Sequence, residues 1–202
     1  MILVTIITSL LYCASTKLSA STILPDTLST EKARLLNGEI IVKLTSLDNG
    51  VTGVFGKIYI KARPEIVWAV LTDYNNHKHY IPKITDSGLI SGNGNEQVIF
   101  QSGQTTILIF RKRVYIKVKT HGEYLKQLDF QQIAGDFKVY HGRWILDESP
   151  QGKGTFLTYE CEVKPDFFAP AFVVRFVQRH DFPMVLSAMK SRAESMAVSV
   201  LK

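Results

Sequence analysis

The stretch Arg63-Pro-Glu-Ile-Val-Trp-Ala-Val-Leu-Thr-Asp-Tyr74 decides how the chain folds, because a strand pattern changes into a helix pattern here. Residues 54–62 just before it alternate like a half-buried strand. Pro64 suits the first turn of a helix, where its missing N–H costs no hydrogen bond. Apolar residues then recur at helical spacing, at Ile66, Val67, Val70 and Leu71. We therefore predict a strand that leads directly into a short helix.

The rest of the chain before residue 165 is rich in strand patterns. Asp48-Asn-Gly50 predicts a type I′ hairpin turn between strands at 39–47 and 51–62, because Asn-Gly tolerates positive φ. Beyond Pro82, turn clusters separate six further predicted strands, at 84–90, 96–104, 107–119, 125–133, 138–146 and 155–164. Their short connections favour an antiparallel meander.

Helix patterns frame these strands. A short helix at 31–36, capped by Ser29 or Thr30, is predicted before the first strand. A long helix is predicted over 167–201, where Pro183 should break or kink it near Asp181. Its apolar stripe consists of Val185, Met189, Ala193, Met196 and Val200. This helix is the only predicted element long enough to cover one face of the sheet, so we predict an α+β fold.

A series of short motifs occurs in a fixed order along residues 38–200. They are Pro64-Glu-x-Val-Trp68, Thr72-Asp-Tyr74, Ile81-Pro82, Gly135-Asp-Phe137, Gly142-x-Trp144, Leu157-Thr-Tyr-Glu160 and Val163-Lys-Pro165. Together they resemble the START-like (SRPBCC) superfamily, in its polyketide cyclase/dehydrase and coenzyme Q-binding branches. The resemblance implies a helix-grip fold, in which a curved antiparallel sheet wraps around a long C-terminal helix. It also implies a hydrophobic cavity for a lipid, quinone or polyketide-like ligand, but it transfers no catalytic residue.

Apolar and aromatic side chains on the strands and the last helix are the candidates for lining this cavity. Such side chains suit a flat or long apolar ligand, although for any single one ordinary core packing is the simpler interpretation. We predict the following lining residues: Phe100, Phe110, Val118, Phe130, Trp144, Tyr159, Phe172, Phe176 and Met189.

Three functions remain open. The first is non-enzymatic binding or carriage of a hydrophobic small molecule, and the second is a cyclase or dehydratase that uses Asp136, Tyr159 or Arg143. Asp136 follows a glycine, however, and such an aspartate more often binds backbone amides in a bulge or turn. The third is a structural or interaction domain with a filled cavity. The sequence has no phosphate loop, nucleophile elbow or zinc spacing, so we predict no catalytic residue, metal or cofactor.

The charged residues and histidines bear on three kinds of binding partner: metal ions, membranes and nucleic acids. His77 and His79 flank Lys78 in a polar segment without a third ligand nearby, so we expect them to be solvated. The net charge is +6, and the densest basic run is residues 111–113 with Lys117 and Lys119. This run suits either transient contact with an anionic membrane or a solvated hairpin edge. It lacks the aromatic interleaving of RNA-binding proteins, so we expect no binding of nucleic acid. We also expect a monomer.

The N-terminus has the composition of a leader. Residues 1–16 carry no charged side chain, and their apolar core is too short to span a bilayer. We predict a signal or leader segment at 1–20, a linker and short helix at 21–37, and the ligand-binding domain at 38–202. We therefore expect the protein to be exported to a periplasm, an organelle lumen or the exterior. The alternative is a cytoplasmic or membrane-associated protein that keeps this segment. Removal of the leader takes Cys13 with it and leaves Cys161 alone, as a small buried hydrophobe.

Overall fold

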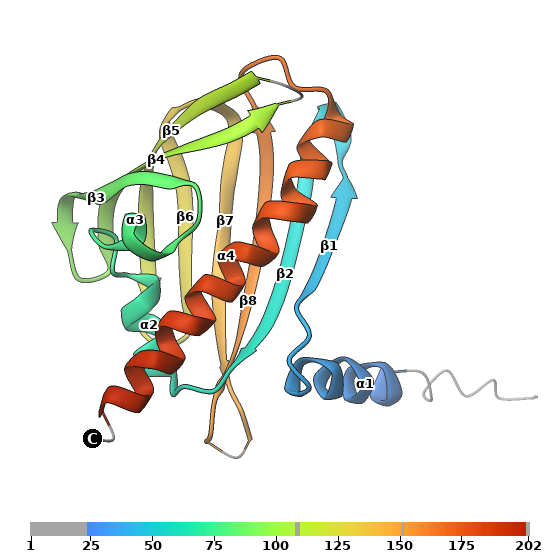
Figure 1. Ribbon diagram of the computed structural model, residues 1–202, viewed down its shortest axis with the longest axis vertical. Helices are drawn as coiled ribbons and strands as arrows, with labels where there is room; N and C mark the ends of the chain where they lie inside the picture. Colours follow the sequence, from blue (N-terminus) through green and yellow to red (C-terminus); the bar gives the residue numbers. More distant parts are fainter. Residues whose placement is uncertain (1–23, 108–109, 151, 201–202) are drawn as a thin grey trace, which may run out of the picture.

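The computed structural model describes residues 24–107, 110–150 and 152–200, so the whole predicted leader, with Cys13, lies outside it. Within the described residues, eight antiparallel strands form one sheet that a long helix crosses (Figure 1). The order of the strands is β1-β2-β8-β7-β6-β5-β4-β3. Their bounds are β1 (Ile41–Ser46), β2 (Thr52–Ile60), β3 (Ile84–Asn93), β4 (Glu96–Ile107), β5 (Phe110–Glu123), β6 (Gln127–Gly135), β7 (Phe137–Glu148) and β8 (Thr155–Pro165). The predicted α+β helix-grip fold is confirmed.

The connectivity is a meander with one exception, the pairing of β2 with β8, which joins the early strands to the last one. The β1–β2 connection is the predicted hairpin turn. Asn49 and Gly50 have φ of 56° and 74°, and the Val51 amide donates to the Asp48 carbonyl oxygen at 3.2 Å. The edge strands are β1 and β3. Residues 111–113 of the basic run lie next to the β4–β5 turn and pair with β4 alone, because pairing of β5 with β6 begins at Ile116. This agrees with the solvated hairpin edge that the sequence predicts, whereas Lys117 and Lys119 lie where β5 is paired on both sides.

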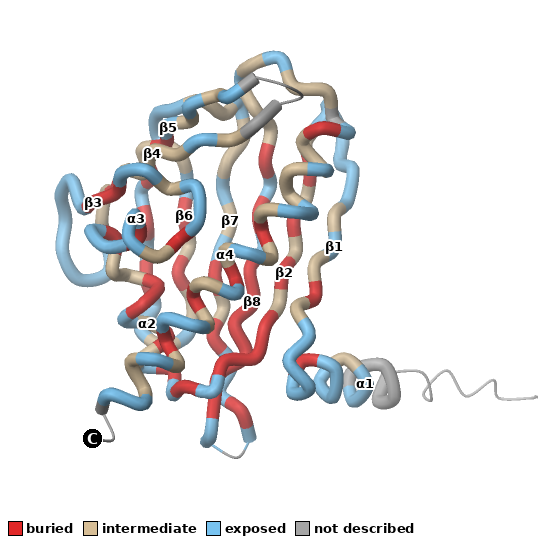
Figure 2. Tube along the Cα trace, in the orientation of Figure 1, coloured by how far each residue is buried: buried red, intermediate tan, exposed pale blue. Residues whose placement is uncertain are grey.

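Four helices accompany the sheet within the described residues: α1 (Leu24–Leu36), α2 (Pro64–Leu71), α3 (His77–Tyr80) and α4 (Ala171–Val200). We call the face of the sheet that α4 covers the inner face. Figure 2 shows buried backbone along β2 and β8 where α4 crosses them. The side chains fully buried in this layer include Ile58, Ile60, Leu157 and Leu186.

Within the described residues, α1 covers the outer face of the sheet near β1 and β2. A small second cluster forms there from Leu35 of α1 together with Ile41, Tyr59 and Phe156. The rings of Tyr59 and Phe156 lie 5.1 Å apart between centroids. This packing holds the last turn of α1 on the sheet, since most helical stability comes from tertiary contacts. The helix begins at Leu24 and is longer than the predicted helix at 31–36. Ser29 and Thr30 lie inside α1, so the predicted cap is wrong.

Pro183 does not break the last helix. The helix runs without interruption from Ala171 to Val200, although proline removes one backbone hydrogen bond. Phe182 and Leu186 on either side of Pro183 are buried against the sheet. Their packing offsets the lost hydrogen bond, which the sequence pattern alone cannot show.

Gly142 marks a close approach between β7 and β8. A Cβ atom at this position would overlap the Glu160 carbonyl oxygen and lie 2.8 Å from both Cys161 Cα and Phe130 Cζ. Glycine in a strand interior often marks such a site, where no side chain fits. The Gly142-x-Trp144 motif is therefore explained by backbone packing.

We predict that Gly142→Ala lowers the free energy of unfolding by about 2 kcal/mol or more, because backbone atoms cannot move away from the new methyl group. Denaturant titration followed by circular dichroism measures this change. Gly53→Ala in β2 is the matched control, since its nearest contacts would be ordinary ones at 3.5 Å or more. Equal effects of the two substitutions would contradict this explanation.

Candidate ligand-binding cavity

A cavity in two neighbouring parts lies between α4 and the inner face of the sheet. The outer cavity has a volume of about 270 Å³ and the inner cavity about 230 Å³. Residues that line both parts are Pro82, Ile84, Gln178, Phe182 and Val185. Each part alone is slightly smaller than a typical small-molecule pocket of about 300–1,000 Å³, and the two together fall within that range.

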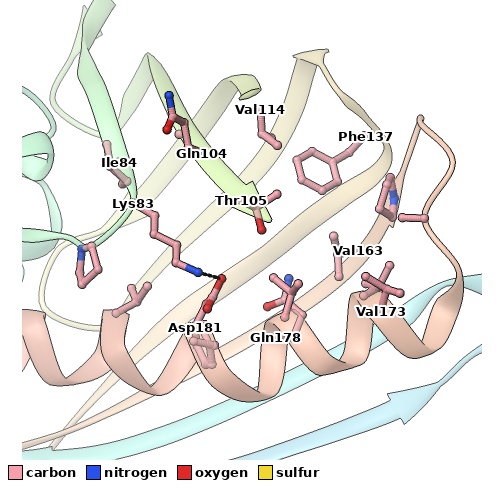
Figure 3. A pocket seen from close by; sticks show the side chains of 18 of the residues that line it. Lys83, Ile84, Gln104, Thr105, Val114, Phe137, Val163, Val173, Gln178 and Asp181 are labelled. Carbon is pink, nitrogen blue, oxygen red and sulfur yellow. Dashed lines mark ion pairs between the residues drawn. The ribbon is translucent and has the colours of Figure 1, made fainter. Parts of the chain in front are cut away.

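The outer cavity lies under the N-terminal half of α4 and is mainly apolar. Its walls include Val114 and Phe137 from the sheet side and Val173 from α4 (Figure 3). The segment before α4 adds Phe167, whose ring centroid lies 6.4 Å from that of Phe137. These surfaces suit an apolar chain or ring.

One ion pair crosses the side of the outer cavity. Lys83 Nζ lies 2.6 Å from an Asp181 carboxylate oxygen and links the segment after α3 to α4 (Figure 3). The Lys83 carbonyl oxygen also accepts a hydrogen bond from the Gln104 amide at 3.0 Å. The segment is thus attached to both β4 and α4 where the two parts of the cavity meet.

Aromatic rings form much of the inner cavity. The ring of Tyr159 lies 4.5 Å from Trp144 and 4.6 Å from Phe182 between centroids, and it stacks on Phe130 at 5.7 Å. Tyr140 adds a further ring next to Phe130. Such contacts hold the rings in fixed positions and give a flat, rigid apolar wall.

Burial keeps the titratable groups of this wall protonated. Loss of water raises the pKa of Tyr159 and of Tyr140 well above the usual range, and it raises the pKa of Cys161 to about 12. Near neutral pH the tyrosine hydroxyls are therefore hydrogen-bonding groups and not bases.

Four polar residues from β4, β5 and the segment after α2 also line the inner cavity, Tyr74, His77, Gln101 and Thr120, which we call the polar corner. Gln178 of α4 is a further polar lining residue. His77 is 3% exposed, and its Nε2 lies 3.3 Å from the Val70 carbonyl oxygen. Its Nδ1 lies 2.9 Å from Gln101 Nε2. Because the Val70 carbonyl can only accept, Nε2 carries the proton and Nδ1 accepts from Gln101.

Five of the predicted lining residues lie on the inner cavity: Val118, Phe130, Trp144, Tyr159 and Met189. The prediction of Phe100 needs correction. Ile99 and Gln101 face the inner cavity, so Phe100 between them points to the outer face. There it lies against Gly88, where an added Cβ would be 2.8 Å from its ring.

The two predicted phenylalanines of α4 also differ from expectation. Phe172 and Phe176 are each 61% exposed, because α4 turns Val173 and Val177 toward the cavity instead. Phe110 begins β5, but its side chain lies outside what the structure describes.

The polar candidates are placed as follows. Asp136 accepts a hydrogen bond from the Tyr115 amide at 2.8 Å, as expected for an aspartate at a bulge, and it lies outside both parts of the cavity. Arg143 faces away from them, toward Asp129 and Glu160. His77 is buried and not solvated as predicted, since α3 places it against β4.

Sequence reasoning missed the polar corner. Strand alternation could have placed Gln101 with Ile99, and Thr120 with Val118, on the inner face. Tyr74 lies between α2 and α3, and His77 begins the single-turn helix α3, so their positions depend on tertiary packing. Within the described residues, no group of three or more histidine, cysteine or acidic side chains could hold a metal ion.

The sequence of residues 60–190 matches the model of a known family, described as polyketide cyclase/dehydrase and lipid transport. The chain belongs to this family. The match covers more than half of the chain and includes both walls of the cavity. No curated protein sequence matches it.

Solved structures of this type have the same fold. A STAR-related lipid transfer protein from Xanthomonas axonopodis aligns with a TM-score of 0.63 at 15% identity, covering 76% of this chain and 93% of its own. The Zhui aromatase/cyclase from Streptomyces sp. R1128 aligns with a TM-score of 0.62 at 13% identity, covering 71% and 94%. Human STARD10 aligns with a TM-score of 0.54 at 13% identity, covering 84% and 79%. At these identities the similarity establishes the fold alone.

The fold of this cyclase and lipid transport family is consistent with a hydrophobic ligand in the cavity. Among the helices that the structure describes, none has the length and apolar content needed to cross a membrane.

We predict that the free energy of unfolding falls as the pH drops below about 6.5, the unperturbed histidine pKa. Burial lowers the pKa of His77, and the Val70 carbonyl and the Asp73 charge oppose this only partly. Below pH 6.5 the unfolded chain therefore binds a proton that folded His77 resists, so stability present above that pH is lost. A tenfold lower proton affinity corresponds to about 1.4 kcal/mol.

Urea titrations between neutral and mildly acidic pH measure this slope in wild type and in His77→Gln. The variant should have a shallower slope. His79→Gln, at an exposed site on the same short helix, should keep the wild-type slope. A wild-type slope in His77→Gln would contradict the assignment.

Proposed function

We propose that the protein binds and carries a hydrophobic small molecule, such as a lipid, a quinone or a polyketide-like compound, without converting it. The observation that carries this proposal is the two-part cavity, with an apolar outer part next to an aromatic inner part. Burial of an apolar ligand there is favourable by about 25 cal/mol per Å² of apolar surface.

The polar groups in the cavity favour carriage over cyclase or dehydratase chemistry. Of the three candidate catalytic residues only Tyr159 faces the cavity, and its raised pKa makes it a poor base. Both ring nitrogens of His77 are already engaged. The open volume also argues against a structural domain whose cavity is filled.

We predict that Val177→Trp abolishes ligand binding, because the indole would occupy the outer cavity from α4. Purified protein is extracted with organic solvent and examined by mass spectrometry, and uptake of the fluorescent probe N-phenylnaphthylamine is titrated. Wild type should release a hydrophobic compound or bind the probe, and Val177→Trp should do neither.

Val198→Trp places the same side chain on an exposed site of α4 and should bind as wild type. Circular dichroism shows whether each variant is folded. A wild type that yields no extracted ligand and takes up no probe would contradict carriage.

Contact with an anionic membrane during ligand exchange is the second part of the proposal. Phe168 is 88% exposed, and Phe172 and Phe176 are each 61% exposed. The two helix residues are four apart, so they lie on one side of α4, next to the outer cavity that this helix lines. Large apolar side chains grouped in this way mark an interaction surface.

Basic groups accompany these rings. Arg175 and Arg179 lie on the same helical turns, and Arg175 donates to Ser46 Oγ at 3.2 Å. Lys112 lies 5.2 Å above the ring of Phe167. Positive charge next to exposed aromatic rings is complementary to a bilayer with anionic head groups. Lys117 and Lys119 belong to the outer face and take no part.

We predict that the double variant Phe172→Ser, Phe176→Ser binds vesicles of phosphatidylcholine and phosphatidylglycerol about tenfold more weakly than wild type, because apolar contact is lost. Co-sedimentation measures this binding, which raised salt should also weaken. Val198→Ser, at an exposed site near the other end of α4, is the control. Unchanged binding in the double variant, or a wild-type dimer that the substitutions dissociate, would contradict a membrane surface.

A further inference from the structure

Tyr74 lines the inner cavity, and its hydroxyl is a donor buried behind the surface of that cavity. Tyr74 is 4% exposed and lines the inner cavity. Its hydroxyl forms no hydrogen bond with any residue that the structure describes. Burial raises the pKa of Tyr74, and the neighbouring Thr120 side chain opposes this in part. The Thr120 hydroxyl donates to the Gln97 carbonyl oxygen at 3.4 Å.

His77 determines the orientation of the Gln101 amide, which places a hydrogen-bond acceptor in the same polar corner as Tyr74. Because Gln101 uses its amide nitrogen to donate to His77 Nδ1, the orientation of the Gln101 amide is determined. Its carbonyl oxygen then remains as an acceptor on the cavity wall, with no donor among the described residues. The polar corner thus presents one hydroxyl donor and one amide acceptor.

The charge of the inner cavity decides which ligand group fits these two. No lysine, arginine, aspartate or glutamate is among the described residues that line it. Burial lowers the pKa of His77, so the ring is neutral near neutral pH. A carboxylate or phosphate would lose its hydration here without gaining a counter-charge, which is costly. A carbonyl or hydroxyl group carries no such cost.

We propose that the polar corner binds a neutral oxygen, a carbonyl or a hydroxyl, at one end of an otherwise apolar ligand. The oxygen accepts from the Tyr74 hydroxyl, and a hydroxyl ligand also donates to Gln101. The ligand enters with this end first and leaves its apolar part against Phe182 and in the outer cavity. This inference rests on the proposed function, because it concerns the same cavity.

The state of Tyr74 without ligand supports this assignment. A buried hydroxyl without a partner costs stability, and a partner supplied by the ligand recovers it on binding. Tyr74 should therefore contribute to affinity and not to the stability of the ligand-free protein. A tyrosine with a purely structural role would do the opposite.

The chemical class of the ligand is tested by displacing bound N-phenylnaphthylamine with three matched ten-carbon probes: methyl octyl ketone, decane and decanoate. Wild type should bind the ketone most tightly and decanoate most weakly. In Tyr74→Phe the affinity for the ketone should fall roughly threefold to tenfold, the value of one hydrogen bond. The affinity for decane should not change.

Tyr80→Phe is the matched control. The Tyr80 hydroxyl donates to the Val70 carbonyl oxygen at 2.8 Å and is not part of the cavity lining, so its removal should leave the order of the probes unchanged. Thermal unfolding without ligand completes the test. Tyr74→Phe should be as stable as wild type or more so, whereas Tyr80→Phe should be less stable.

The outcomes separate this inference from the function on which it rests. No displacement by any probe, together with no uptake of N-phenylnaphthylamine, would contradict carriage itself. Uptake with equal affinity for ketone and decane, or an unchanged ketone affinity in Tyr74→Phe, would overturn the polar corner alone. Tightest binding of decanoate would overturn it as well, since it would show that an anion is accepted.

Discussion

The contact of α4 with β2 at Gly56 is the constraint on which the rest of the structure depends. A Cβ atom at Gly56 would overlap the Phe182 ring and lie 3.1 Å from Leu186. Glycine thus lets α4 approach the backbone of the sheet at this point. Phe182 also contacts Tyr159 and lines both parts of the cavity. The residue that fixes the helix on the sheet is therefore also the residue around which the cavity is divided, so the position of α4 and the shape of the cavity cannot vary independently.

The shape of the rest of the cavity follows from the sizes of the side chains that α4 turns toward the sheet. Close packing under the middle of α4 is provided by Phe182 and Leu186, whereas toward its N-terminus smaller side chains, Val173 and Val177, face the strands. Small side chains leave space that large ones would fill. The segment between α2 and α3 supplies Tyr74, and α3 supplies His77. One end of the cavity is consequently apolar and the other carries hydrogen-bonding groups, and a ligand with two unlike ends has one preferred direction.

The sequence predicts the fold better than it predicts the cavity lining. Alternation and turn residues placed all eight strands to within a few residues, because half-buried strands leave a strong local pattern. The sequence predicts less well which face of the sheet or helix each side chain points to. Phe100 was expected in the cavity, but one step along the strand reverses its side. Phe172 and Phe176 share a helix with the lining residues Val173 and Val177, and only tertiary packing decides which stripe is buried. Likewise, α3 is one helical turn, so no local pattern reveals that His77 is buried against Gln101 while His79 is exposed.

The polar corner shows why stability and ligand selectivity compete at this site. An interior selected for stability alone would pair the Tyr74 hydroxyl or replace it with a hydrocarbon, and it would not bury the imidazole of His77. Both groups remain in an otherwise apolar wall, at a cost that the core around Leu157 and Leu186 can offset. That cost has a physical use if the missing partner comes from a ligand, because a hydrogen bond in a dry cavity discriminates strongly against molecules that cannot form it. An apolar wall alone distinguishes ligands by little more than size and shape. The orientation of Gln101 by His77 adds the second requirement, because it fixes the position of an acceptor that a freely rotating amide would not hold.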